Sequence, residues 1–259
     1  MTTEPSVAAP ARALLVARGV TKRFGAVEAL TGVDFEVDAG EVVALVGDNG
    51  AGKSTLIKAL SGTQPGDEGE ITFDGKAVTI KSPLDAKRLG IATVYQDLAL
   101  CDNLDVVSNL YLGEELYEKG PGSLFKVIDE IAMEKRAVEL LDSLAVTTLS
   151  SVRSEVGSLS GGQRQSVAIA RSLLGDPKVV LLDEPTAALG VSQTRQVLDL
   201  VLRLKDRGLG VIIISHNIAN VFEVADRIVV LRLGRRVETF QASETTHDEI
   251  VGAITGSRG

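Results

Sequence analysis

The chain has 259 residues, a length that suits one large α/β domain, alone or with an inserted subdomain, better than two independent domains. It carries 27 Lys and Arg against 35 Asp and Glu, and its net charge of −8 disfavours nucleic acid as the main partner. No apolar run approaches the roughly 18 residues that cross a bilayer, and no signal peptide is evident, so we expect a cytoplasmic protein. The single cysteine, Cys101, excludes an internal disulfide.

The N-terminal part predicts a tail followed by strands. Residues 1–12 are rich in Ala, Pro, Thr and Ser, which predicts a flexible tail before one domain over residues 13–259. From Ala13 to Val37, short apolar stretches alternate with turn signals, a pattern typical of two or three strands in an antiparallel edge sheet. Phe24 lies between cationic residues and a glycine. It is either an exposed ring for stacking on a base or an ordinary edge-strand side chain.

The most informative stretch is a phosphate-binding loop. Two glycines separated by four residues are followed by Lys and Ser, which is the pattern of a nucleotide-binding loop. An apolar strand precedes it and a helix follows it, so backbone N–H groups and the positive end of the helix can hold phosphates. Lys53 is expected to reach the β- and γ-phosphates and the Ser54 hydroxyl to bind Mg²⁺. The predicted loop residues are Gly47, Asp48, Asn49, Gly50, Ala51, Gly52, Lys53, Ser54 and Thr55.

Beyond the loop, the alternating stretch from Gly69 to Ile80 predicts a hairpin that extends the edge sheet. A short helix is expected at about Pro83 to Arg88. The next strand, Ile91 to Tyr95, ends at Gln96 and Asp97. A polar pair at the carboxyl end of a strand stands where open α/β sheets place their ligand contacts.

From about residue 98 to residue 175 the pattern changes and predicts an inserted helical subdomain. Parallel-strand runs are missing there, and a helical pattern extends from about Val127 to Leu144. The pentapeptide of Leu159, Ser160, Gly161, Gly162 and Gln163 opens another helix. Ser160 is a suitable N-cap, and the two glycines expose N–H groups, so we expect a second anion cradle there.

Two further strands end in polar side chains. The apolar strand from Lys178 ends in Asp183 and Glu184, and these consecutive carboxylates should point in different directions. One suits Mg²⁺ and the other an attacking water, although a strand capped by two solvated acids is the plainer alternative. The strand Val211 to Ser215 ends at His216, which could hydrogen-bond a phosphate or be structural. A helix from about Ser192 to Arg207, a hairpin over residues 227–240 and a helix near residues 248–254 complete the prediction.

Together these motifs resemble the nucleotide-binding subunit of ABC transporters, over about residues 14–240. The resemblance implies an α/β P-loop NTPase with a parallel sheet in a RecA-like core, an N-terminal antiparallel edge sheet and an inserted helical subdomain. It implies ATP and Mg²⁺ as ligands and assigns Phe24 to adenine stacking. It makes Ser54, Gln96 and Asp183 the metal contacts, Glu184 the general base and His216 the γ-phosphate sensor. The pentapeptide of each subunit would close over ATP on the other, in a homodimer.

The loop after Glu184 departs from the family pattern. Ala187, Ala188, Leu189 and Gly190 stand where the family usually has Ser-Ala-Leu-Asp, which puts in doubt the contact that this loop makes across a dimer. The change is similar to sugar importer ATPases of ribose, xylose or fructose type. That resemblance implies a membrane permease as partner, a sugar-binding protein as an indirect one, and a peripheral position on the inner membrane face. An importer for amino acids or lipids, or a non-transport ABC ATPase, remains the alternative.

Overall fold

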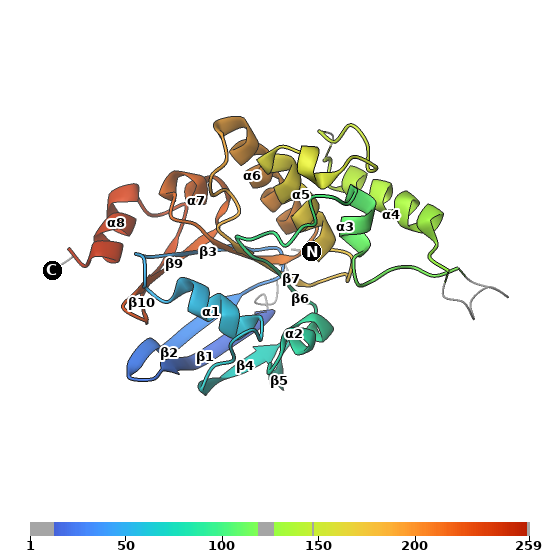
Figure 1. The fold of residues 1–259 in the computed structure, drawn as a ribbon. Helices are drawn as coiled ribbons and strands as arrows, with labels where there is room; N and C mark the ends of the chain where they lie inside the picture. Colours follow the sequence, from blue (N-terminus) through green and yellow to red (C-terminus); the bar gives the residue numbers. More distant parts are fainter. Residues whose placement is uncertain (1–12, 119–126, 147, 258–259) are drawn as a thin grey trace, which may run out of the picture.

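A computed structural model describes residues 13–118, 127–146 and 148–257, so the expected tail at residues 1–12 lies outside the described residues. Its strands form two sheets, and its helices lie on one side of the larger sheet and between the two (Figure 1). The strands are β1 (Leu15–Phe24), β2 (Val27–Val37), β3 (Val42–Val46), β4 (Glu68–Phe73), β5 (Lys76–Val78), β6 (Ile91–Val94), β7 (Val179–Asp183), β8 (Gly210–Ile214), β9 (Arg227–Arg232) and β10 (Arg235–Gln241). The helices are α1 (Lys53–Leu60), α2 (Pro83–Leu89), α3 (Val106–Tyr111), α4 (Glu130–Ser143), η2 (Val156–Ser158), α5 (Gly161–Ser172), α6 (Val191–Asp206), α7 (Ile218–Val224) and α8 (His247–Thr255).

The six-stranded sheet has the order β10-β9-β3-β8-β7-β6, and all neighbouring pairs except β10 with β9 are parallel. Strands β3 and β8 are buried along their whole length, which explains their continuous apolar sequences. Because five of the strands are parallel, their carboxyl ends lie along one edge. The parallel sheet and the closing hairpin expected over residues 227–240 are confirmed.

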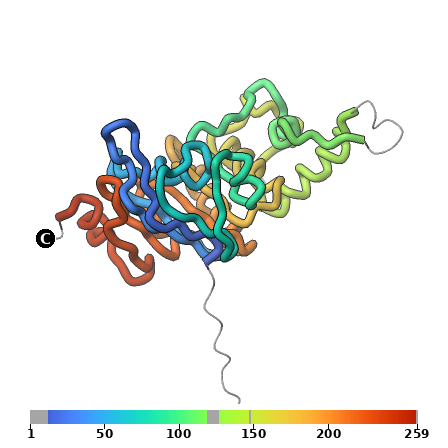
Figure 2. Tube along the Cα trace, turned by 90° about the horizontal axis from the view of Figure 1, so that it is seen from below, coloured from blue at the N-terminus to red at the C-terminus, as the bar shows by residue number. Residues whose placement is uncertain are grey.

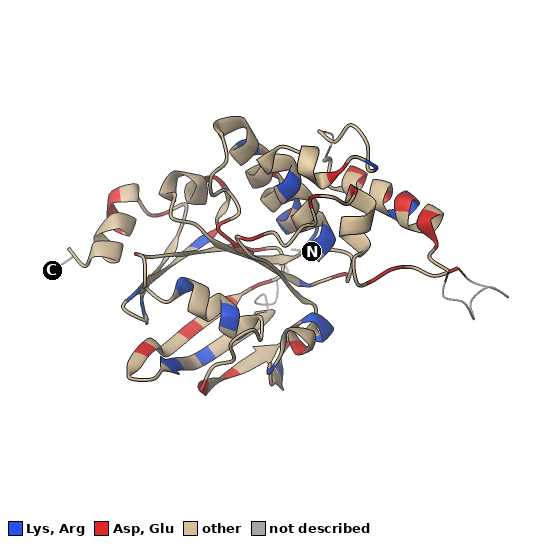
Figure 3. Cartoon of the chain, viewed as in Figure 1, with Lys and Arg blue, Asp and Glu red and all other residues tan. Residues whose placement is uncertain are grey.

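The four-stranded sheet has the order β2-β1-β4-β5 and is antiparallel throughout. It confirms the expected edge sheet and the extension by the β4–β5 hairpin. Arg23 on β1 forms ion pairs with Glu28 on β2 and Glu68 on β4, at 2.9 and 2.7 Å, so one guanidinium links three strands. Figure 3 shows both signs of charge interspersed on this sheet.

Two hydrophobic cores lie on opposite faces of the six-stranded sheet. On β3, Ala44 belongs to the core shared with helices α3 to α8, whereas Leu45 belongs to the core shared with α1 and the four-stranded sheet. Helix α1 packs between the two sheets, and Leu56, Ile57 and Leu60 on it are fully buried. This double-sided packing fixes the end of β3, from which the phosphate-binding loop emerges.

The segment between β6 and β7 consists of helices and loops, and its described residues contribute two isolated β-bridges but no strand. In Figure 2 this green and yellow segment extends to one side of the strands. The expected start of its long helix at about Val127 is wrong by three residues: Ile128 instead pairs with Tyr117 in a bridge, and Asp129 caps α4 through a bond from the Ala132 N–H. The boundaries at about 98 and 175 stay a prediction.

Within the ranges the structure describes, we find no helix with the length and apolar character that a membrane crossing requires.

Candidate functional site

A cleft of about 560 Å³ opens at the carboxyl ends of the parallel strands. The segments that follow four strands, β3, β6, β7 and β8, contribute residues to it. The chain therefore brings predicted site residues together from segments up to about 170 residues apart. The lining residues are Gly47, Asp48, Asn49, Gln96, Glu184, Ala187, Ser215, His216, Ile218, Val251 and Ile254.

The backbone of the phosphate-binding loop requires glycine at its tightest positions. Gly47 has φ 151°, and a Cβ there would lie 2.2 Å from the carbonyl oxygen of Leu231. Gly52 has φ 102° and forms the N-cap of α1, where a Cβ would lie 2.7 Å from the Ala29 carbonyl oxygen. The loop is therefore pressed against β9 and β2, and the N-terminus of α1 is presented to the cleft side.

Lys53 is held inside this loop. Its side-chain ammonium donates to the carbonyl oxygens of Gly47 at 2.7 Å and Asp48 at 2.9 Å, and the residue is 8% exposed. Burial lowers the pKa of Lys53, an effect opposed by the nearby carboxylates of Glu184, Asp48 and Asp183. A cation that is buried against carbonyl oxygens gains when an anion enters the loop, because the anion satisfies its charge directly.

The two carboxylates after β7 differ in their surroundings. Burial and the neighbouring charge of Glu184 raise the pKa of Asp183, although Lys58 and Lys53 pull it down. Glu184 adopts a left-handed backbone conformation with φ 52°, and its N–H donates to the Ile214 carbonyl oxygen at 3.1 Å. Glu184 lines the cleft, whereas Asp183 is not among the lining residues, and the separate roles of the two carboxylates stay a prediction.

His216 contacts Glu184 directly. Its Nδ1 lies 2.8 Å from the Glu184 Oε2, and the Glu184 side chain is 15% exposed whereas that of His216 is 70% exposed. The two residues follow β7 and β8, which are adjacent in the sheet. Of the predicted residues at the strand ends, Gln96, Glu184 and His216 line one cleft.

The donor set expected to bind magnesium fits that ion. Ser54, Gln96 and Asp183 offer a hydroxyl, an amide carbonyl and a carboxylate, which are the hard oxygen ligands that Mg²⁺ prefers, with water completing its shell. Burial and the neighbouring charge of Glu184 raise the pKa of Asp183, so a divalent cation would stabilise the ionised carboxylate that both effects disfavour. Gln96 is exposed and lines the cleft.

The pentapeptide of residues 159–163 lies outside this cleft. Ser160 caps α5: its hydroxyl accepts from the Gln163 N–H at 3.3 Å, and the Gln163 Oε1 accepts from the Ser160 N–H at 2.8 Å. Gly162 is buried against α6, where a Cβ would lie 2.9 Å from that of Gln193. Ser160 and Gly161 are exposed, so the start of α5 is presented to solvent, away from the phosphate-binding loop of the same chain.

Phe24 ends β1 and is 45% exposed. The ammonium of Lys22 lies 5.7 Å from the centre of its ring, a cation–π contact. Phe24 is therefore an exposed aromatic at the end of an inner strand, since β1 lies between β2 and β4 in its sheet.

Several cleft residues were not predicted. Ser215 and Ile218 follow β8, and their neighbourhood to His216 in the sequence could have signalled them. Val251 and Ile254 come from α8, which was predicted as a helix but not placed beside the cleft. Nothing in the sequence signals that placement.

The fold and the cleft define an α/β protein with a phosphate-binding loop at the carboxyl edge of a mainly parallel sheet. A family model described as ABC transporter matches residues 30–187, more than half of the chain. The chain therefore belongs to the ABC transporter family.

Two relatives match nearly the full length of the chain. The fructose import ATP-binding protein FrcA of Rhizobium meliloti is 48% identical over 246 residues, which cover 95% of each chain. The xylose/arabinose import ATP-binding protein XylG of Sulfolobus acidocaldarius is 48% identical over 242 residues, covering 93% of this chain and 94% of the relative.

Solved structures show the same fold. The ADP conformation of an ATP-binding cassette of an ABC transporter has a TM-score of 0.79 and 30% identity, and the match covers 94% of this chain and 95% of the other. A dimeric ATP-binding cassette in a post-hydrolysis state, bound to ADP and phosphate, has a TM-score of 0.71 and 25% identity, with 88% and 98% covered. The P-loop NTPase fold predicted for this chain is confirmed, and the roles of its individual site residues stay predictions.

Proposed function

We propose that this chain is the ATP-hydrolysing subunit of an ABC importer for a sugar, most simply a monosaccharide. The observation that carries the ATPase part is the cleft in which the phosphate-binding loop, Glu184 and His216 meet. The sugar part is supported by the two relatives, which are named for fructose and for xylose or arabinose import and are matched along their length.

In the proposed reaction the phosphate-binding loop holds the triphosphate. Lys53 exchanges the carbonyl oxygens of Gly47 and Asp48 for phosphate oxygens, and its charge stabilises the negative charge that builds up on the γ-phosphate. Glu184 orients the attacking water and accepts its proton, and His216 donates a hydrogen bond to the γ-phosphate. Ser54, Gln96 and Asp183 would hold Mg²⁺, and the ion would supply positive charge to offset the negative charge of the phosphates.

The complete site takes two copies of the chain. The start of α5, with Ser160 and Gly161, is exposed and lies outside the cleft of its own chain, so its N–H groups are available to the nucleotide of a second copy. The dimeric cassette with ADP and phosphate among similar structures supports this arrangement. Gly161, Gly162 and Gln163 complete the proposed cradle, and Phe24 stacks on adenine.

Gly190 stands where the family usually has aspartate, and here it begins α6. Its N–H is 3.3 Å from the Gln193 Oε1, so the backbone and Gln193 cap the helix without an acidic side chain. Ala187 and Leu189 of the same loop face a cavity shared with His216. We infer that this loop contacts a second copy through backbone and apolar groups instead of a carboxylate.

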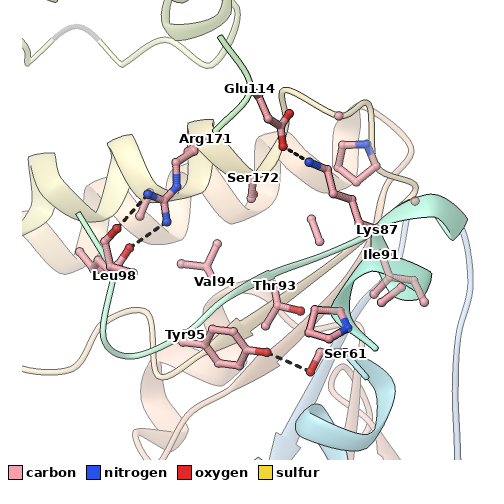
Figure 4. Close-up of a pocket in the computed structure, with 18 of the residues that line it drawn as sticks. Ser61, Lys87, Ile91, Thr93, Val94, Tyr95, Leu98, Glu114, Arg171 and Ser172 are labelled. Carbon is pink, nitrogen blue, oxygen red and sulfur yellow. Dashed lines mark hydrogen bonds and ion pairs between the residues drawn. The ribbon is translucent and has the colours of Figure 1, made fainter. Parts of the chain in front are cut away.

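The permease would contact the chain beside Gln96. A cavity of about 410 Å³ lies there between β6, α2 and the helical segment, and Arg171 of α5 donates to the carbonyl oxygens of Leu98 and Ala99 at its wall (Figure 4). A segment seated in this cavity would touch both the residues after Gln96 and the helix that starts at the pentapeptide. Such a subunit is cytoplasmic and peripheral to the membrane.

The assignment is tested by reconstituting the chain with a sugar permease and a sugar-binding protein. Proteoliposomes should take up a monosaccharide only with internal Mg·ATP, and a panel of fructose, xylose, arabinose and ribose should identify it. Uptake of an amino acid in place of every sugar would support the rival importer class, and recovery of nucleic acid with the purified chain would favour a non-transport ABC ATPase. Either result would overturn the sugar assignment.

A further inference from the structure

Tyr95 and Gln96 are consecutive residues, yet they line different cavities. Gln96 lines the cleft with the phosphate-binding loop, whereas Tyr95 lines the 410 Å³ cavity beside β6. Both follow β6, where neighbouring side chains of an extended chain point in opposite directions. A single peptide unit therefore separates the wall of one cavity from the wall of the other.

The Tyr95 hydroxyl belongs to a cluster of three hydroxyl groups. It donates to Ser61 Oγ at 3.0 Å and lies 2.6 Å from Thr63 Oγ1, and Ser61 Oγ and Thr63 Oγ1 are 3.1 Å apart. Figure 4 shows the tyrosine ring directed at Ser61. Every member contacts the other two, so the phenol oxygen is held at a defined place.

Ser61 and Thr63 are themselves fixed by the end of α1. Ser61 is 2% exposed. Its N–H donates to the carbonyl oxygen of Ile57 at 2.8 Å, and its hydroxyl donates to the carbonyl oxygen of Lys58 at 3.2 Å. The next residue, Gly62, has φ 72° and is so close to Ser82 that a Cβ would lie 2.3 Å from its carbonyl oxygen. The turn that presents both hydroxyls therefore has little freedom to move.

Helix α1 joins this turn to the phosphate-binding loop. It starts at Lys53 and ends just before Ser61, and all of its apolar side chains are buried between the sheets. The hydroxyl cluster thus links Gln96, through Tyr95, to the far end of the helix whose first residue is Lys53. On the C-terminal side of Gln96, Arg171 donates hydrogen bonds to the carbonyl oxygens of Leu98 and Ala99.

We propose that Tyr95 is a positioning residue for Gln96: its hydroxyl ties the segment that carries Gln96 to the helix that carries Lys53. These hydrogen bonds fix the position of the Gln96 side-chain amide relative to the phosphate-binding loop. The tyrosine ring also lines the neighbouring cavity, so a group that binds there and displaces the ring would move Gln96. The inference rests on the proposed function, because it is measured through Gln96 and Mg·ATP.

The test compares Tyr95→Phe, Gln96→Ala and the double variant in the full chain. Two quantities are measured over a range of Mg²⁺ concentrations: the affinity for a fluorescent ATP analogue, and the rate of phosphate release. Tyr95→Phe removes the hydrogen bonds of the hydroxyl. The Mg²⁺ concentration that gives half of the maximal rate of phosphate release should therefore rise about threefold to tenfold. The affinity for the analogue in EDTA should stay within about twofold of the parent value, since the loop itself is untouched.

Three results separate the possibilities. If Tyr95 acts through Gln96, the double variant should require no more Mg²⁺ for half of the full effect than Gln96→Ala does. If Gln96→Ala itself leaves the Mg²⁺ dependence unchanged, the metal role in the proposed function is wrong. If Gln96→Ala shifts that dependence and Tyr95→Phe does not, or if the two effects multiply, the positioning role of Tyr95 is refuted.

Two further variants exclude a merely structural effect. The double variant Ser61→Ala with Thr63→Ala removes both partners of the tyrosine hydroxyl and should reproduce the Tyr95→Phe shift. Tyr111→Phe is the matched control, because Tyr111 is 4% exposed and its hydroxyl has no hydrogen-bond partner among the described residues. It should leave the Mg²⁺ dependence unchanged. A lower melting temperature in Tyr95→Phe with an unchanged Mg²⁺ dependence would contradict the proposal.

Discussion

The carboxylate of Glu184 is paired with the ring of His216, with Oε2 and Nδ1 2.8 Å apart. The pair joins the ends of two adjacent parallel strands, and Glu184 has a left-handed backbone conformation with φ 52°, which is costly for a residue other than glycine. Glu184 and His216 line the same cleft as the phosphate-binding loop. We therefore predict that Glu184 acts on a water in front of that loop.

Replacing Glu184 by glutamine should abolish hydrolysis and keep nucleotide binding. The amide retains the size of the side chain but cannot accept a proton, so phosphate release should fall roughly 100-fold or more. Calorimetry should show an ATP affinity within about threefold of the parent chain, since Lys53 and the loop are unchanged.

Glu134→Gln is the matched control for that experiment. Its carboxylate is paired with Arg153 at 2.7 Å, on α4 and outside the cleft, so turnover should remain at the parent level. Normal turnover in Glu184→Gln would remove Glu184 from the mechanism.

Two glycines of the phosphate-binding loop provide a stability test. Gly47→Ala should lower the free energy of unfolding by on the order of 3 kcal/mol, because its Cβ would collide with the Leu231 carbonyl oxygen. Gly50 has φ 79° with open space around it, so Gly50→Ala should cost about 1 kcal/mol from backbone strain alone. Urea unfolding measures both values. Equal losses would show that the close approach to β9 has no energetic importance.

The N-cap of α3 provides a test of pH dependence. Burial raises the pKa of Asp105, but bonds from Ser108 and Arg153 outweigh it and hold the pKa below the ordinary value. A carboxyl group with a lowered pKa stabilises the fold above pH about 4, and this stabilisation is lost as the pH falls through the folded-state pKa.

Asp105→Asn keeps an oxygen for the cap but removes the charge that faces Arg153. It should therefore be less stable than the parent chain by about 1 kcal/mol at pH 7, and the difference should shrink toward pH 3 as the parent carboxylate is protonated. Urea unfolding at several pH values measures this. A difference that does not change with pH would show that the ion pair contributes nothing.

The sequence predicted the buried strands well, for a physical reason. A strand covered on both faces must be apolar throughout, and β3, β7 and β8 show such runs between polar ends. The short helices α3 and α7 were not predicted, since six or seven residues are too few for a helical period to stand out. Helix α4 starts later than expected because Ile128, two residues before it, pairs with Tyr117 in an isolated bridge, and helical periodicity does not reveal such a bridge.

The same distinction holds for the site. Gln96, Glu184 and His216 could be brought together from the sequence, because each follows a strand and parallel strands end at one edge. Val251 and Ile254 could not, because the place of α8 depends on packing against β9 that involves residues far apart in the chain. The hydroxyl cluster around Tyr95 is likewise a product of tertiary structure alone.

The central claim is that each nucleotide is held by the phosphate-binding loop of one copy and the pentapeptide of another. It is tested most directly by mixing two inactive proteins, Lys53→Ala and Ser160→Arg, and measuring phosphate release. If the sites are shared, mixed dimers contain one site with an intact loop and an intact pentapeptide, and activity should appear on mixing, up to about a quarter of the parent rate if the sites act independently. If the mixture is no more active than the two proteins measured separately, the shared site is contradicted.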